Sequence, residues 1–319
     1  MPDQNALIKP PRLHFGDLVG VVAPSSPPAE PRAVTQAAAA FAKLGFNTRL
    51  APNARKRLGF LAGSDAERAA DLMDMFLDPE IKGIVCLRGG YGAGRLLRLL
   101  DYQKISRHPK VFVGFSDITA LHCALVTQAR LICFHGPTAV RAAADGGLPE
   151  FTRRSLLRSV MEPAPSGSLC AGYTGKTVRV IHPGRAAGPL LGGNLSLLCA
   201  ILGSPFQPDL RRAILFFEDV GEEPYRLDRM LTHLLNAGLL QQVAGIAIGI
   251  NAQCESRARK KRHQTMDEVL DERLSTLGIP VLTGLPFGHI PSNATLPLGI
   301  TATLDTARRD LVIDAPAVR

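Results

Sequence analysis

Three side chains that together could activate a nucleophile each follow a strand-like run of apolar residues. VFVGF precedes Ser116, AILFF precedes Glu218, and IPVLTGL precedes His289 by a short Pro-Phe-Gly step. The carboxyl ends of parallel strands meet at one edge of a sheet, which is where open α/β sheets bind their ligands. A serine hydroxyl needs a base to take its proton, and an imidazole base needs a carboxylate to fix its tautomer. The sequence therefore predicts a hydrolase in which Ser116 is the nucleophile, His289 the base and Glu218 the acid that orients the base.

Ser116 also stands where a strand turns directly into a helix. The first N–H groups of a helix have no intrahelical partner and lie at the positive end of the helix dipole. We therefore expect the backbone N–H of Asp117 to form one half of an oxyanion hole. The turn resembles a nucleophile elbow, although the segment GFSDI (114–118) lacks the second glycine of the G-x-S-x-G pattern.

Each of the three side chains also has an ordinary structural interpretation. Ser116 could simply cap the helix that follows it, because serine is a favoured N-cap residue. Glu218 could be a solvated loop acid, since further acids follow it closely, and His289 could be a loop histidine with satisfied hydrogen bonds. The chain has eight histidines, so the count alone does not select this one.

The segment RGGYGAG (88–94) is the most glycine-dense part of the chain. It could be a turn that requires positive φ angles or a loop that binds a phosphate. A dinucleotide site is disfavoured, because the glycines are spaced G-G-x-G-x-G rather than G-x-G-x-x-G. Glycines also let the main chain approach a carbonyl oxygen closely, so we expect the N–H of Gly90 to be the second oxyanion donor.

The first half of the chain alternates short apolar runs with longer amphipathic ones. This alternation predicts an α/β domain with a parallel sheet covered on both faces, of the flavodoxin or amidotransferase type. We expect strands at 18–24, 81–87 and 111–115, and helices at 30–45, 65–76, 95–100 and after Ser116.

The composition changes between residues 141 and 183, where Gly, Pro, Ser and Ala dominate around a helix predicted near 150–161. We therefore predict an N-terminal domain that carries the nucleophile (1–145), a connection (146–183) and a C-terminal mixed β/α domain that carries the acid and the base (184–319). In the last of these we expect helices near 194–202 and 226–237 and strands at 213–217, 243–250, 279–285, 300–304 and 310–314.

Composition excludes several classes of protein. No apolar run approaches the roughly 18 to 20 residues that a membrane span requires, and the N-terminal residues lack the apolar core of a signal peptide. The six cysteines show no C-x-x-C spacing, which is typical of reduced thiols in a reducing compartment. We therefore expect a cytoplasmic protein with no membrane partner, no disulfide framework and no metal site.

The formal net charge of +9 raises the possibility of nucleic-acid binding. Five of the positive charges fall in the single run from Arg257 to Arg262. No aromatic residues are interleaved there to stack on bases, so a solvated loop is the favoured interpretation and no nucleic-acid partner is expected.

Seven blocks of sequence occur in an order that resembles one known family. They are VVAPSSP (21–27), LRGGYGAGRLL (87–97), VGFSDITALH (113–122), FHGPTA (134–139), GPLLGGNLSLL (188–198), ILFFEDVGEEPYRLDRML (214–231) and FGHIPSNATLPLG (287–299). Together they resemble the LD-carboxypeptidase family of serine peptidases, which also contains the microcin C self-immunity proteins.

The resemblance implies a two-domain enzyme with its catalytic site at the domain interface. The family's G-[YF]-S-D pattern coincides with Ser116, its E-D-V-G-E block with Glu218 and its G-H block with His289. It also implies a homodimer that needs no cofactor. Typical members cleave the bond between an L-centred diamino acid and the terminal D-alanine of murein tetrapeptides during peptidoglycan recycling.

Two alternatives to a murein carboxypeptidase remain. Microcin-type relatives hydrolyse an aminoacyl nucleotide and often hold its base on a tryptophan, but this chain has no Trp and only four Tyr, which favours the murein enzyme. A protein that binds a peptidoglycan fragment without cleaving it would not need a nucleophile, a base and an acid. The substrate's carboxylate needs a cationic or N–H-rich anchor; Arg88, Tyr91 and Arg226 are candidate substrate-binding residues, although either arginine could instead be structural.

Overall fold

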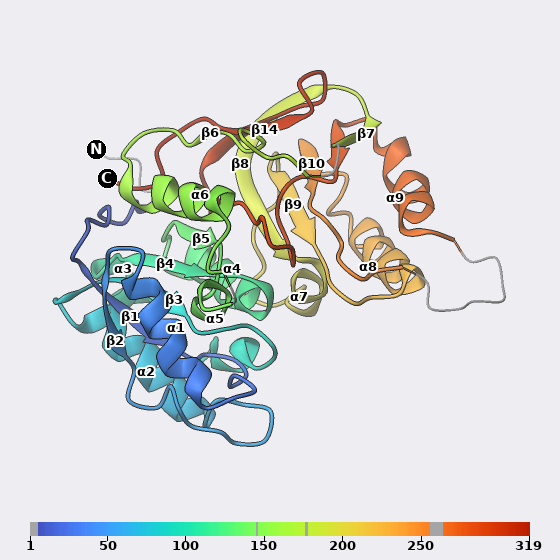
Figure 1. Ribbon diagram of the computed structural model, residues 1–319. Helices are drawn as coiled ribbons and strands as arrows, with labels where there is room; N and C mark the ends of the chain where they lie inside the picture. The colour runs from blue at the N-terminus through green and yellow to red at the C-terminus, as the bar shows by residue number, and fades with distance from the viewer. Residues whose placement is uncertain (1–5, 145, 176–177, 256–263) are drawn as a thin grey trace.

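Two β-sheets organise the chain (Figure 1). The computed structural model describes residues 6–144, 146–175, 178–255 and 264–319. The first sheet lies in the half of the molecule coloured blue to teal, and most of the second lies in the half coloured yellow to red. The basic run from Arg257 to Arg262 lies outside the described residues.

The first sheet has six strands in the order β12-β5-β4-β3-β1-β2 and is parallel except at β12. Strands β1 and β4 consist of apolar residues and glycine, because helices cover the sheet and leave no side of these strands to solvent. The strands are β1 (Leu18–Val22), β2 (Asn47–Leu50), β3 (Ile81–Cys86), β4 (Val111–Gly114), β5 (Cys133–His135) and β12 (Leu296–Leu298).

The helices of this half connect the parallel strands. Helix α2 shows why it begins where it does: the Ser64 hydroxyl accepts a hydrogen bond from the N–H of Glu67, and the Glu67 carboxylate accepts one from the N–H of Ser64. Its apolar side chains then recur every three or four residues and face the sheet. The helices are α1 (Arg32–Ala42), α2 (Asp65–Leu77), α3 (Tyr102–Arg107), α4 (Thr119–Gln128) and α5 (Ala139–Ala142), with 3-10 turns at Ala93–Leu96 and Ser116–Ile118.

The second sheet has eight strands in the order β6-β14-β13-β8-β9-β10-β11-β7, of which β8 to β11 are mutually parallel. The strands are β6 (Gly167–Ser168), β7 (Arg179–His182), β8 (Arg185–Asn194), β9 (Ile214–Glu218), β10 (Gly245–Ile248), β11 (Val281–Thr283), β13 (Thr301–Asp305) and β14 (Asp310–Ile313). The accompanying helices are α6 (Glu150–Met161), α7 (Leu195–Ala200), α8 (Pro224–Asn236) and α9 (Met266–Leu274), with a 3-10 turn at Ser275–Leu277.

Several contacts join the halves, and two of them position the site. The hydroxyl of Thr119, at the start of α4, accepts a hydrogen bond of 2.9 Å from the backbone N–H of Asn194, at the end of β8. The late strand β12 returns to the first sheet and pairs antiparallel with β5. The carboxyl ends of β4 and of β8 and β9 are thereby brought to the same region.

Most of the expected elements are present. The helices predicted at 30–45, 65–76 and 150–161 correspond to α1, α2 and α6, and the predicted C-terminal strand pair corresponds to β13 and β14. The helix predicted at 95–100 was wrong, since only the 3-10 turn Ala93–Leu96 forms there. The Asp101 side chain accepts a hydrogen bond from the N–H of Lys104 and so caps a separate helix, α3.

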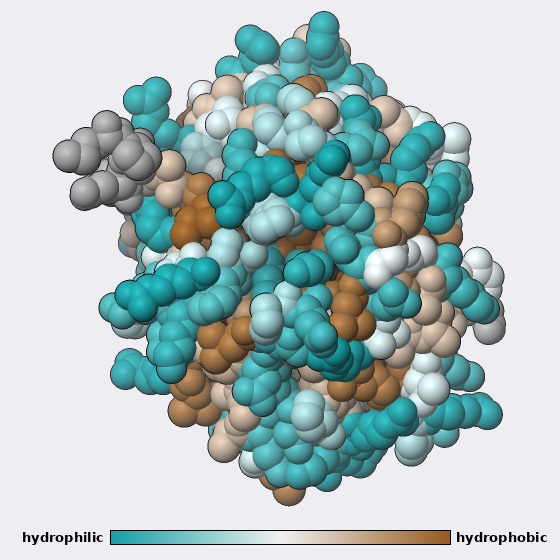
Figure 2. Space-filling view, turned by 90° about the vertical axis from the view of Figure 1, so that its left-hand side faces the viewer, coloured by the Kyte–Doolittle hydropathy of each residue, from teal (hydrophilic) through white to brown (hydrophobic). Residues whose placement is uncertain are grey.

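The surface is mixed. On the face shown in Figure 2, hydrophilic side chains surround several separate hydrophobic patches. All six cysteines are free thiols. Within the described ranges, no helix combines the length and the apolar character needed to cross a bilayer.

Candidate active site

A buried carboxylate and an imidazole meet at the carboxyl end of β9. Glu218 is the last residue of that strand and is fully buried. Its Oε2 lies 2.7 Å from Nδ1 of His289, whose side chain is 21% exposed. A carboxylate only accepts hydrogen bonds, so Nδ1 carries the hydrogen and Nε2 is left as the basic nitrogen. The pair has the geometry of a base and the acid that fixes its tautomer.

The amide of Asn194 supports this carboxylate from another side. Its Nδ2 donates to Oε1 of Glu218 at 3.4 Å and to Oδ1 of Asp219 at 3.0 Å. Asp219 is also held by Ser196, whose N–H and hydroxyl donate to Oδ2 at 2.9 and 2.7 Å. Asp219 therefore has partners of its own and does not compete for the imidazole. Sequence reasoning missed Asn194, because its place before α7 is that of an ordinary helix N-cap.

The residue before the histidine has no room for a side chain. Gly288 has a φ of 118°, in the region that favours glycine. A Cβ at this position would lie 3.0 Å from Oε2 of Glu218 and 2.9 Å from the carbonyl oxygen of Ile250. The loop that carries His289 is therefore pressed directly against the carboxylate.

Ser116 has the backbone conformation of a nucleophile elbow. Its φ is 66°, which residues other than glycine rarely adopt. The residue is the first of the 3-10 turn Ser116–Ile118, and the N-cap position of that turn belongs to Phe115. The left-handed conformation costs about 1–2 kcal/mol, and such strain is typical of functional sites. A plain N-cap does not account for this conformation.

Phe115, the residue before Ser116, links the elbow to the histidine. The ring of Phe115 packs on the imidazole of His289 with 4.8 Å between the ring centroids. In the described part of the chain the imidazole bonds to Glu218, and the hydroxyl of Ser116 donates no hydrogen bond to it. Catalytic hydrogen bonds are often long in unliganded enzymes and tighten when the substrate binds. The structure thus joins Glu218 and His289 directly, and Ser116 follows in the chain the residue whose ring packs on the imidazole.

The side chain of Asp117 ties together the two loops next to the elbow. Its Oδ2 accepts hydrogen bonds of 2.6 Å from the hydroxyl of Ser25 and of 2.8 Å from the N–H of Ala93. Ser25 lies in the loop after β1, and Ala93 lies near the end of the glycine-rich segment after β3. Buried Arg68 on α2 adds hydrogen bonds to main-chain carbonyls of the same two loops. Sequence reasoning had assigned Asp117 a role through its backbone only.

The two N–H groups expected to form the oxyanion hole have no acceptor among the described residues. Among the described residues, neither the N–H of Asp117 nor that of Gly90 donates a hydrogen bond to another protein group. Gly89 lies directly against the elbow, since a Cβ there would be 2.9 Å from the Cβ of Ser116 and 3.2 Å from the N of Asp117. Gly90 follows with a φ of 115°. The absence of a side chain at Gly89 therefore allows the main chain to pass close to Ser116.

Comparison with known proteins covers both halves of the chain. Residues 19–136 match the LD-carboxypeptidase N-terminal domain, and residues 187–304 match the LD-carboxypeptidase C-terminal domain. A probable murein peptide carboxypeptidase of Bacillus subtilis is 39% identical over 312 residues, which cover 96% of this chain and 94% of the relative. The chain belongs to the LD-carboxypeptidase family. The predictions of family, α/β fold class and carboxypeptidase activity are confirmed.

Two solved structures are similar to this LD-carboxypeptidase over nearly its whole length. The muramoyltetrapeptide carboxypeptidase from Oxalobacter formigenes matches with a TM-score of 0.82 at 29% identity, covering 94% of this chain and 99% of that one. The microcin C7 self immunity protein MccF, in complex with aspartyl sulfamoyl adenosine, matches with a TM-score of 0.87 at 25% identity, covering 98% and 100%.

Three candidate substrate-binding residues of this LD-carboxypeptidase remain, and we call them the rim residues: Arg88 is half-buried, and Tyr91 and Arg226 are exposed. The guanidinium of Arg88 donates to carbonyl oxygens of Gly89 and Pro27, both at 3.2 Å. Tyr91 is 54% exposed and stands edge-on to another exposed ring. Arg226 is exposed at the start of α8 and contacts Glu222 at 3.4 Å. The side chain of Arg88 thus holds its own loop, whereas the other two face solvent.

Two buried histidines lie beneath the site. The ring centroid of His135 lies 5.9 Å from that of Phe115 and 6.3 Å from that of His122. Burial lowers the pKa of His122 to about 3. It also lowers the pKa of His135 well below its usual range, and the nearby His122 and His289 act in the same direction. Both rings are therefore uncharged at neutral pH.

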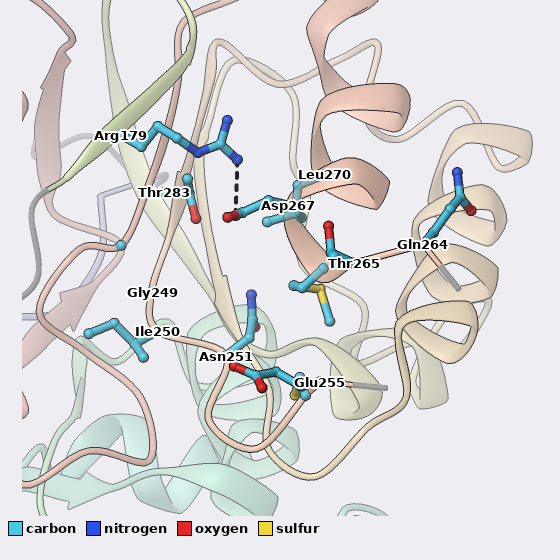
Figure 3. A pocket seen from close by; sticks show the side chains of 13 residues that line it. Arg179, Gly249, Ile250, Asn251, Glu255, Gln264, Thr265, Asp267, Leu270 and Thr283 are labelled. Carbon is cyan, nitrogen blue, oxygen red and sulfur yellow. Dashed lines mark hydrogen bonds and ion pairs between the residues drawn. The ribbon is translucent and has the colours of Figure 1, made fainter. Parts of the chain in front are cut away.

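A cavity of about 620 Å³ opens beside the carboxyl ends of β10 and β11. Figure 3 shows Arg179 and Asp267, 3.1 Å apart, on one side of it and Asn251 and Glu255 on another. Ile250, which also lines it, pairs with Gly288 through a parallel bridge. The cavity therefore adjoins the histidine loop, but none of the three predicted catalytic side chains lines it. Among the described residues, no group of three or more His, Cys, Asp or Glu side chains is arranged to hold a metal ion.

Proposed function

We propose that this LD-carboxypeptidase is a serine enzyme that releases the terminal D-alanine from murein tetrapeptides. The observation that carries the proposal is the contact of 2.7 Å between His289 and buried Glu218. The ring of Phe115 packs on this imidazole, and the next residue is the serine held at a φ of 66°. The names of the relatives support the substrate, because they include a murein peptide carboxypeptidase and a muramoyltetrapeptide carboxypeptidase.

In the proposed reaction, Oγ of Ser116 attacks the carbonyl carbon of the residue before D-alanine. Nε2 of His289 takes the hydroxyl proton, and Glu218 stabilises the imidazolium through Nδ1–H. The N–H groups of Asp117 and Gly90 stabilise the negative oxygen of the tetrahedral intermediate. The imidazolium then gives its proton to the leaving amine of D-alanine, which leaves a tripeptide esterified to the serine.

A water molecule completes the cycle. His289 removes a proton from the water as it attacks the ester carbon, and it returns that proton to Oγ as the ester bond breaks. The products are the tripeptide, D-alanine and the free enzyme.

Three rim residues are proposed to contact the substrate. Arg226 is the proposed anchor for its free carboxylate, because its guanidinium is exposed and has five N–H donors. Its hydrogen bonds, of 3.1 Å from Nε to the hydroxyl of Tyr225 and of 3.4 Å from Nη1 to Glu222, leave donors for a ligand. Tyr91 is proposed to contact the peptide from the glycine-rich loop. Arg88 is proposed to act nearby, although its two hydrogen bonds to carbonyl oxygens favour a role in shaping that loop.

We further propose that the enzyme acts in the cytoplasm as a homodimer and binds neither nucleic acid nor membrane. The six free thiols support a reducing compartment. Gel filtration coupled to light scattering tests the dimer, and a monomer at micromolar concentration contradicts it.

An aminoacyl nucleotide is the second candidate substrate, and one observation supports it. The fold matches MccF bound to aspartyl sulfamoyl adenosine with a TM-score of 0.87. The chain has no Trp to stack on a nucleobase, whereas its identity to the murein peptide carboxypeptidase is 39%. The murein peptide is therefore the proposed substrate.

The test is a substrate panel analysed by mass spectrometry. It contains a tetrapeptide with L-lysine or diaminopimelate before D-alanine, the same tetrapeptide ending in L-alanine, and aspartyl sulfamoyl adenosine. We expect loss of one alanine from the first peptide only. Cleavage of the adenosine compound with an intact tetrapeptide would replace the murein assignment by the nucleotide one. Binding without cleavage of any compound would indicate a non-catalytic protein.

A further inference from the structure

The proposed base lies in a loop and not within a helix or a strand. Residues 284–295 join β11 to β12, and His289 stands in the middle of them. The loop makes backbone hydrogen bonds of its own, among them Ala294 N–H to the Pro286 carbonyl at 2.8 Å. A loop of this kind needs support from neighbouring elements to hold an imidazole within hydrogen-bond distance of a carboxylate.

Helix α6, in the segment that connects the two halves, supplies that support. The hydroxyl of Thr152 accepts a hydrogen bond of 2.8 Å from the N–H of Asn293 and donates one of 3.1 Å to the carbonyl of Pro291. One turn further along the same helix, the hydroxyl of Ser155 accepts a hydrogen bond of 2.9 Å from the N–H of Thr295. Residues three apart share a face of a helix, so α6 presents both hydroxyls to the loop.

Asn293 carries the contact from the helix to the histidine. Its backbone bonds to Thr152, and its side-chain Oδ1 accepts a hydrogen bond of 3.0 Å from the N–H of Gly288. Gly288 in turn lies against Oε2 of Glu218 and immediately precedes His289. Thr152 is fully buried and Asn293 is 2% exposed, so water does not replace either contact easily.

We infer that Thr152 and Asn293 are positioning residues, which act through the backbone of Gly288 to hold His289 against Glu218. The inference rests on the proposed role of His289 as the base. It assigns the connecting helix to the framework of the active site, in addition to its role in joining the two halves.

The inference predicts a loss in turnover rather than in substrate binding. Removing the Thr152 hydroxyl frees the turn at 291–293 and lets the imidazole move relative to Glu218, while the rim residues stay in place. A misplacement of about 1 Å in a catalytic group can cost about 100-fold in rate. We expect Thr152→Val, which keeps the shape of the side chain, to lower kcat by about 10- to 100-fold and to change KM by less than about threefold.

A matched control exists elsewhere in the chain. The hydroxyl of Thr306 also accepts from a backbone N–H and donates to a carbonyl, in this case both of Gly184, at 2.8 and 2.9 Å. It is similarly buried but lies after β13, in contact with none of the residues of the site. Thr306→Val therefore removes two hydrogen bonds of the same kind as those of Thr152, but none of them involves the loop that carries His289.

The experiment measures kcat, KM and melting temperature for the wild type, Thr152→Val, Thr152→Ser and Thr306→Val with the tetrapeptide. We expect both valine variants to melt at lower temperature, only Thr152→Val to lose kcat, and Thr152→Ser to recover most of it. Equal kcat in the two valine variants overturns the inference. Absence of D-alanine release by the wild type instead refutes the proposed function. If Thr152→Val does not fold, Asn293→Ala replaces it, and an unchanged kcat in that variant overturns the inference equally.

Discussion

Replacing Glu218 by Gln changes the charge and one atom of a fully buried side chain. In the wild type, both carboxylate oxygens accept: Oε2 from Nδ1 of His289 at 2.7 Å and Oε1 from Nδ2 of Asn194 at 3.4 Å. Glutamine offers one acceptor and one donor in their place. If its oxygen faces the imidazole, its NH₂ group faces the NH₂ group of Asn194. If its NH₂ group faces the imidazole, Nδ1 loses its hydrogen and Nε2 is no longer a base.

The size of the effect follows from what either orientation removes. Both remove the negative charge that stabilises the imidazolium, and one also selects the wrong tautomer. The corresponding change in a Ser-His-Asp triad lowers kcat by about 10⁴-fold. We expect Glu218→Gln to lower kcat by about 10³- to 10⁴-fold, which is about 4–5.5 kcal/mol of lost transition-state stabilisation. The loss should be less complete than in Ser116→Ala, because the nucleophile remains.

The assay is release of D-alanine from the tetrapeptide at saturating concentration, with Ser116→Ala as the baseline. Circular dichroism and the melting temperature establish that each variant is folded. An activity of Glu218→Gln within about tenfold of the wild type would refute the argument, because a buried carboxylate that orients the base cannot be neutralised at so small a cost. An activity equal to that of Ser116→Ala would show that its role is larger than orientation.

Three further predictions follow from the backbone and from burial. The free energy of unfolding of Ser116→Gly should exceed that of Ser116→Ala by up to about 1 kcal/mol. Glycine avoids the cost of the left-handed conformation, and the greater freedom of its unfolded chain offsets part of that gain. Urea titration measures the difference, and a glycine variant less stable than the alanine variant contradicts the prediction. Gly288→Ala should lower kcat at least about tenfold, because its Cβ would lie 3.0 Å from Oε2 of Glu218; a normal kcat contradicts it. His122 has a folded-state pKa of about 3 against a usual value of 6.5, so the unfolded state binds its proton first and the free energy of unfolding should fall as pH drops from about 6.5 to about 3. In urea titrations, His122→Leu should reduce the slope of the free energy of unfolding against pH by up to about 1.4 kcal/mol per pH unit. An unchanged slope contradicts the low pKa of His122.

Local patterns were sufficient to predict much of this fold. The apolar runs that became β1, β3, β4 and β9 are buried strands, and the helices α1, α2 and α6 show the periodicity expected of them. The helix expected at 95–100 failed because a capping side chain three residues before Lys104 started a new helix instead. Strand β12 was not predicted, since its partner is β5, more than 150 residues away in the chain, and three residues carry too little pattern.

In the candidate site, too, residues with a local signal could be predicted and residues defined by distant contacts could not. Ser116, Glu218 and His289 could be proposed from the sequence because each follows an apolar strand, which is a local signal. Thr152 and Asn194 were not found, because their importance lies in contacts with residues 141 and 24 positions away, respectively. Threonine within a helix and asparagine before one are both common, so neither residue type stands out in a sequence.

The central claim is that the hydroxyl of Ser116 is the nucleophile. The most direct measurement is D-alanine release by purified Ser116→Ala, compared with the wild type on the same tetrapeptide, with both proteins shown to have the same fold and oligomeric state. The account predicts that the variant releases no D-alanine above the uncatalysed rate. Release by the variant at a rate close to that of the wild type would contradict it.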